Sequence, residues 1–93
     1  MPNEHGPLWR VSGGLAGLEA DLVPVFQLGE EASLSGVFTA WLELDASGRV
    51  ARVLVEPAVS DRVLAAKLDR AFRECLFWPA GEPREGRLVI RIP

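Results

Sequence analysis

Apolar side chains alternate with other residues in three stretches of the chain, at 36–44, 49–56 and 87–92. This alternation is typical of β-strands, because successive side chains point to opposite faces of a sheet. Each strand is therefore expected to place one set of apolar side chains in the core. The expected inward residues are Phe38, Ala40, Leu42, Leu44, Ala51, Val53, Val55, Leu88, Ile90 and Ile92.

The first two strands are separated by a short turn at 45–48. Asp45 has a side chain that readily starts a turn, and Gly48 can adopt the positive φ that closes a type I turn with a bulge. Pro57 ends the second strand, because proline has no N–H for a sheet ladder. The pattern predicts an antiparallel hairpin over 36–56.

A helical pattern follows the hairpin, with apolar residues at steps of three and four and charged residues between them. Ser60 is the predicted N-cap, and Asp61 after it suits the positive end of the helix dipole. Pro79 marks the end of this segment. The expected buried stripe consists of Val63, Leu64, Leu68, Ala71, Phe72, Cys75 and Leu76.

The order strand, strand, helix, strand predicts an α+β fold. A right-handed crossover places the third strand beside the first, so we expect a two-layer ββαβ domain over 36–93. Its three-stranded antiparallel sheet would have the strand order 2-1-3, with one main helix on one face. The second and third strands would then be edges, unless the N-terminal segment covers one of them.

Residues 1–35 are predicted to be an irregular N-terminal arm, because prolines and glycines interrupt any long helix. A short helical turn near 28–33 is compatible with the pattern. The arm is too apolar for a solvated linker, so its residues 22–26 are expected to fold over the second face of the sheet. The alternative is that this face is a docking surface for another chain, formed by Val37, Trp41 and Leu54.

Composition narrows the function classes. The 93 residues are 48% hydrophobic and 25% charged, as expected for one globular domain. The net charge of -3 and the absence of a basic stripe argue against a nucleic-acid partner. With one histidine and one cysteine, the chain offers no metal cluster and no nucleophile paired with a base. We expect no catalytic activity, no metal and no cofactor, and we interpret Cys75 as a small buried apolar residue.

Several short motifs resemble the C-terminal domain of TonB-like energy transducers. They are the Gly36-Val37 strand opening, the turn sequence at 45–50 and the Phe77-Trp78-Pro79-Ala80 segment after the helix. The resemblance covers residues 36–92 and keeps the order and spacing of that family. The family commonly has a tyrosine-proline pair before the strand glycine, whereas this chain has Val25-Phe26 there and contains no tyrosine.

The resemblance implies a periplasmic adaptor that grips a short extended peptide, the TonB box, of an outer-membrane receptor. Force from inner-membrane motor proteins would pass through an N-terminal anchor that this sequence lacks, so a fragment of an inner-membrane-anchored protein is expected. The peptide would add a strand to an exposed edge. The predicted partner-binding edge strand consists of Arg87, Leu88, Val89, Ile90, Arg91 and Ile92.

Two further readings stay open. The same fold could serve as a scaffold or assembly domain of an envelope or secretion complex, as in TolA-type modules, without energy transduction. The missing tyrosine favours that alternative. A homodimer formed by strand exchange is also compatible with a small sheet that has two edges.

Overall fold

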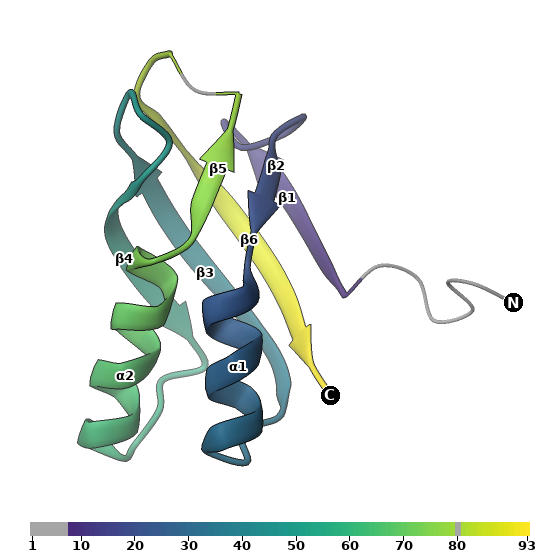
Figure 1. Cartoon of the computed structure of the whole chain (residues 1–93), viewed down its shortest axis with the longest axis vertical. Helices are drawn as coiled ribbons and strands as arrows, with labels where there is room; N and C mark the ends of the chain where they lie inside the picture. The colour runs from purple at the N-terminus through teal and green to yellow at the C-terminus, as the bar shows by residue number, and fades with distance from the viewer. Residues whose placement is uncertain (1–7, 80) are drawn as a thin grey trace, which may run out of the picture.

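A computed structural model describes residues 8–79 and 81–93 and shows two layers, a sheet and a pair of helices that cover one of its faces (Figure 1). The main sheet has four antiparallel strands in the order β1-β6-β3-β4. These strands are β1 (Trp9–Gly13), β3 (Gly36–Leu44), β4 (Val50–Glu56) and β6 (Arg84–Ile92). The helices are α1 (Val23–Glu31) and α2 (Arg62–Arg73), and a small second sheet pairs β2 (Glu19–Asp21) with β5 (Leu76–Trp78).

The predicted α+β class and antiparallel sheet are confirmed. The three predicted strands lie in the expected order, β4-β3-β6. The three-stranded ββαβ description is incomplete, however, because the main sheet has a fourth strand and the helical layer has a second helix. Both additions come from the segment that was expected to be an irregular arm.

Helix α1 begins at Val23 and runs to Glu31, so the single turn expected near 28–33 is too short. Pro24 lies in the first turn, where its missing N–H breaks no helical hydrogen bond. The carboxylate of Asp21 accepts a hydrogen bond from the Val23 N–H at 3.1 Å. Gly29 is tolerated inside the helix because Ile92 of β6 packs where a Cβ atom would stand.

Residues 22–26 pack on the same sheet face as α2, and the expectation that they cover the second face is wrong. Leu22 and Val25 are buried in the core, Phe26 is partly buried against it, and Val23 is exposed. Four strands span about 19 Å, whereas one helix covers about 10 Å. Two helices side by side are therefore needed to bury the apolar face of this sheet (Figure 1).

The core lies between the helices and the sheet. All seven inward positions that alternation predicts on β3 and β6 are buried, and the aromatic residues Phe72 and Phe77 lie in the core with them. Val63 and Leu76 are exposed, against prediction. Leu76 belongs to β5, where alternation turns Phe77 inward and Leu76 outward.

Strand β4 contains a β-bulge that changes the predicted facing of two residues. The register shifts between Glu43 and Leu44, so that Leu44 pairs with Val50 and Glu43 pairs with Arg52. Val50 is consequently buried and Ala51 is exposed, the reverse of the expectation from strict alternation. The guanidinium of Arg73 on α2 donates a hydrogen bond to the Ala51 carbonyl at 2.8 Å.

The predicted hairpin is confirmed. One oxygen of Asp45 accepts hydrogen bonds from the backbone N–H and the hydroxyl of Ser47, at 2.9 and 2.6 Å, and from the Arg49 N–H at 3.1 Å. The Gly48 N–H donates to the Asp45 carbonyl at 3.0 Å, and Gly48 has a φ of 88°. These bonds hold the pKa of Asp45 below its usual value, the hydrogen bond from the Ser47 side chain being the main cause.

Helix α2 is capped by Asp61, not by Ser60 as predicted. Asp61 has extended backbone angles, and its carboxylate accepts hydrogen bonds from the N–H groups of Val63 and Leu64 at 2.9 and 3.1 Å. The helix therefore starts one residue later than expected. Among the described residues, neither helix has the length and hydrophobicity needed to cross a membrane.

Candidate docking surfaces

The predicted edge strand is not an edge. Strand β6 is hydrogen-bonded to β3 on one side and to β1 on the other, with Trp9 opposite Ile90 and Val11 opposite Leu88. The prediction that residues 87–92 form a free edge is therefore wrong, because the N-terminal segment supplies a further strand. Leu88, Ile90 and Ile92 are buried, so only the alternate side chains of this strand reach the surface.

Glycines allow the chain to stay close to β6 where β1 ends. The Gly14 N–H donates a hydrogen bond to the Glu85 carbonyl at 2.8 Å, and a Cβ atom at Gly14 would approach the same oxygen to less than 3.0 Å. Gly13 has a φ of 68°, a backbone conformation that glycine adopts at low cost. The attachment of β1 thus depends on residues without side chains.

The outer strands of the main sheet are β1 and β4 (Figure 1). Strand β1 has 5 residues and β4 has 7. The bulge and the Arg73 hydrogen bond interrupt the regular ladder near the start of β4. On β1 and β4, the stretch of main chain that could pair with another strand is therefore shorter than the 9 residues that β6 would have offered as an edge.

The three residues predicted as an alternative docking surface do lie on one face, the one turned away from the helices. Val37, Trp41 and Leu54 are 58%, 45% and 61% exposed. Trp41 is the cross-strand partner of Leu54 on β4 and of Arg87 on β6. We call this side of the main sheet the open face. It carries large apolar side chains that residues 8–35, the described part of the arm, leave uncovered.

Trp41 is held in position by two polar neighbours. The guanidinium carbon of Arg87 lies 4.9 Å from the centre of the indole ring, within cation–π distance. The indole Nε1–H donates a hydrogen bond to Glu56 at 3.4 Å. An exposed aromatic side chain with few accessible orientations loses little entropy when another surface packs on it.

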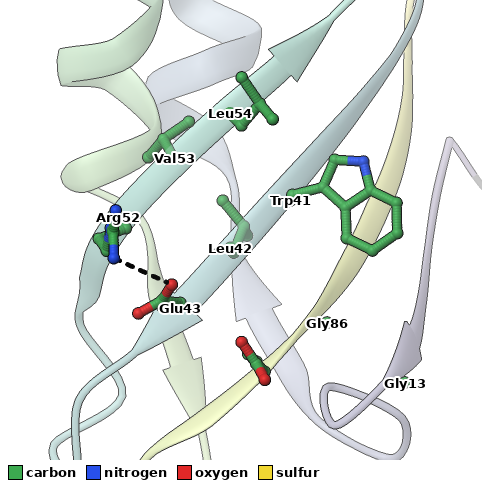
Figure 2. Close-up of a pocket in the computed structure, with 9 residues that line it drawn as sticks. Gly13, Trp41, Leu42, Glu43, Arg52, Val53, Leu54 and Gly86 are labelled. Carbon is green, nitrogen blue, oxygen red and sulfur yellow. Dashed lines mark ion pairs between the residues drawn. The ribbon is translucent and has the colours of Figure 1, made fainter.

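A shallow groove of about 690 Å³ runs along this part of the open face. Figure 2 shows its labelled side chains on neighbouring strands, with Trp41 and Leu54 at one part and the Arg52–Glu43 ion pair at another. The ion pair has an N–O distance of 3.6 Å, and Glu43 is also the cross-strand partner of Glu85. Apolar and charged side chains both line the groove. Such a mixed lining is suited to binding the surface of another protein.

The groups with chemical reactivity lie elsewhere. Cys75 is buried, its Sγ is 3.3 Å from the Ala71 carbonyl, and burial raises its pKa to about 12. The thiol is therefore protonated at neutral pH and a poor nucleophile. Within residues 8–79 and 81–93, no group of three or more His, Cys, Asp or Glu side chains is placed to hold a metal ion.

Sequence reasoning missed two charged members of the open face. Arg10 reaches it from β1, and Glu56 from the end of β4. The alternation of Trp9 and Val11 with Arg10 and Ser12 is a strand signal, but five residues between prolines and glycines make a weak one. Pairing with β6 is what makes this segment a strand.

Comparisons with protein-family models, with curated proteins and with solved structures find no match to this chain.

Proposed function

We propose that this chain is a periplasmic protein-binding domain of a TonB-like energy transducer, which holds an extended receptor peptide by adding it as a strand to β6. Inner-membrane motor proteins would supply the force through an anchor outside this sequence. The observation that carries the proposal is that β6 already holds a short antiparallel strand, β1, along the edge suggested by the resemblance. A receptor peptide would take the place of β1.

Strand β1 is suited to exchange with a peptide. It has only 5 residues, and its core-facing side chains Trp9 and Val11 are only partly buried. Segments with few buried apolar contacts open at a lower free energy than the rest of a domain. Strand β3, in contrast, is 9 residues long and contributes four buried side chains to the core, so the sheet can keep β6 in place while β1 leaves.

A peptide bound in this way would resist force through several main-chain hydrogen bonds at once. On the open face it would lie beside Arg87, Val89 and Arg91, whose side chains alternate with the buried residues of β6. The cationic residues favour a peptide with acidic side chains at alternate positions. Peptides with acidic or neutral side chains at these alternate positions should therefore differ in affinity.

The second candidate function is a scaffold or assembly domain of an envelope or secretion complex. The observation that favours it is the open face, where Trp41 and Leu54 are exposed beside each other while the β6 edge is occupied. In that case the partner would contact side chains of the face, and β1 would remain on β6.

An amide NMR titration with peptides from the N-terminal segments of candidate outer-membrane receptors separates the two functions. Strand addition predicts shifts along 87–92 together with loss of protection of the β1 amides, while the β6 amides stay paired, now to the peptide. The Gly14→Ala variant, which crowds the Glu85 carbonyl, should loosen β1 and raise peptide affinity, whereas Ser12→Ala, at an exposed position of β1, should not.

Shifts confined to the surroundings of Trp41 and Leu54 would support the scaffold function instead. If no receptor peptide binds either the natural chain or the Gly14→Ala variant, the transducer proposal fails. Folding of the variant is checked by its retained β3–β4 amide pattern, which does not involve β1.

A further inference from the structure

The open face has an ordered distribution of charge. One row of cross-strand partners runs Arg10, Val89, Thr39, Glu56, from β1 through β6 and β3 to β4. A cation therefore stands at one end of the row and an anion at the other, separated by three strand spacings or about 14 Å. The next row along the strands runs Ser12, Arg87, Trp41, Leu54 and is apolar on the β4 side.

The row that runs from Arg10 to Glu56 is complementary in charge to a second copy of itself. A two-fold axis parallel to the strands and midway between β6 and β3 would lay β1 of one copy over β4 of another, and β6 over β3. Each row then faces the same row in reverse order. Arg10 of each copy faces Glu56 of the other, and Arg87 of each faces Trp41 of the other, so each of these contacts forms twice.

We propose that the open face is the interface of a homodimer, in which two sheets pack face to face with their strands nearly aligned. A second copy accounts for both ends of the row, because it brings a carboxylate to Arg10 and a guanidinium to Glu56. A purely acidic partner would meet Glu56 with the wrong charge. The same axis lays Glu85 of each copy over Glu43 of the other, a like-charge contact that the ion pair of Glu43 with Arg52 offsets in part. The dimer does not rest on the proposed function, but it needs β1 in place, because Arg10 belongs to β1. It therefore concerns the chain without a bound receptor peptide.

The apolar contribution comes from the centre and the β4 side of the face. Trp41, held by Arg87 and Glu56, would be the main anchor, because a buried tryptophan commonly dominates an interface. Val37 and Leu54 are more than half exposed in the single chain and would be covered as well. With the two sheets packed about 10 Å apart, the two Trp41 side chains would meet beside the axis, while Leu54 would lie over Ser12 of the other copy and Val37 over Arg91.

The small size of the face makes weak, reversible association the expectation. Strands of 5 to 9 residues in a four-stranded sheet give a face of about 25 by 19 Å. Two such faces bury roughly 1,000 Å² in total, at the lower limit for specific association. We therefore expect a reversible dimer with a dissociation constant of about 10 to 100 μM.

The test is sedimentation velocity of the full chain over a concentration series up to about 1 mM, combined with charge reversals. Arg10→Glu and Glu56→Arg should each weaken association about tenfold or more, because each creates two like-charge contacts per dimer. The double variant should return to within about threefold of the natural chain. Arg10 and Glu56 are too far apart within one copy for this rescue to be intramolecular.

Two further variants complete the design. Leu54→Asp, at an exposed position that a single chain tolerates, should abolish the dimer. Arg62→Glu makes the same change of net charge as Arg10→Glu at the start of α2, outside the face, and should leave association unchanged. Amide spectra at low concentration verify that every variant keeps the fold.

The proposal is overturned if the natural chain remains monomeric over the whole series. It is also overturned if a dimer forms but is insensitive to Leu54→Asp and to both reversals, which is the behaviour expected of strand exchange through β1. A double reversal that associates no better than the single reversals would likewise contradict it.

Discussion

Gly86 of β6 faces the carbonyl oxygen of Ser12 in β1 so closely that a Cβ atom on Gly86 would approach that oxygen to less than 3.0 Å. The side chain of Leu15 and the Gly14 N–H would be its other near neighbours, each at 3.0 Å. β1 can therefore lie this close to β6 only because residue 86 has no side chain.

Gly86→Ala is therefore expected to detach the end of β1 from β6 and to lower the free energy of unfolding by about 1 to 3 kcal/mol. Hydrogen exchange of the β1 amides should speed up more than that of the β3 and β4 amides. The comparison is Gly17→Ala, where nothing lies within 4 Å of a Cβ atom and the only cost is a φ of 86°. That variant should lose about 1 kcal/mol while β1 stays protected. Equal protection of β1 in both variants would refute the expectation.

The turn at 45–48 contributes folding stability that is lost at acid pH. The pKa of Asp45 is lowered in the folded chain, mainly by the Ser47 hydroxyl, so the ionised carboxylate stabilises the fold above its unfolded pKa near 3.8. This stabilisation is lost as the pH falls below that value. Denaturation at a series of pH values should show a steeper acid loss for the natural chain than for Asp45→Ala. Identical slopes would contradict the assignment.

The N-cap of α2 can be tested by two neighbouring substitutions. Asp61→Ala removes the acceptor for the Val63 and Leu64 N–H groups and should cost about 1 kcal/mol of unfolding free energy. Ser60→Ala should be close to neutral, because Ser60 is exposed and precedes the cap. Urea denaturation of both variants measures the difference. The opposite ranking would indicate that the helix starts at Ser60.

The buried thiol of Cys75 makes the folding stability decrease at alkaline pH. Its pKa rises from 9.0 to about 12 on folding because the thiol is buried, so the folded chain retains this proton over a range in which the unfolded chain loses it. The contribution is fully present below pH 9.0 and is lost as the pH rises toward about 12. The slope is about 1.4 kcal/mol per pH unit at most.

Cys75→Ala removes this titration and should flatten the stability curve between pH 9 and pH 11, although it lowers stability at pH 7 by leaving a small cavity. A thiol reagent at pH 8 should modify the native chain only as fast as the chain opens. Rapid modification of the folded protein would show that the thiol is accessible.

Local patterns in the sequence were sufficient for the hairpin, for α2 and for the strand at 87–92. In each, the alternation or the helical spacing of apolar residues extends over enough positions to define one buried face, and the turn residues Asp45 and Gly48 act within four residues of each other. The order of these three strands followed from the handedness of one connection.

The same patterns did not distinguish Ser60 from Asp61 as the cap, because both residue types accept hydrogen bonds from helix N–H groups. They also gave the wrong facing for Val50 and Ala51, since strict alternation assumes a ladder without the bulge that pairs Leu44 with Val50. Both errors are local. The predicted helix cap and the predicted inward-facing position of β4 each differ from the observed one by a single residue.

The chemistry of the turn, the apolar face of each long strand and the helical stripe are thus determined by the sequence alone, because they depend on neighbours within a few residues. Only the tertiary structure decided that β1 pairs with the outer side of β6 and that α1 joins α2 on one face. It also decided that residues 8–79 and 81–93 leave the other face open. The physical reason is that a five-residue strand and a nine-residue helix are stable only against the surfaces they cover. Those surfaces, such as the gap beside Gly86, exist only once the rest of the sheet has formed.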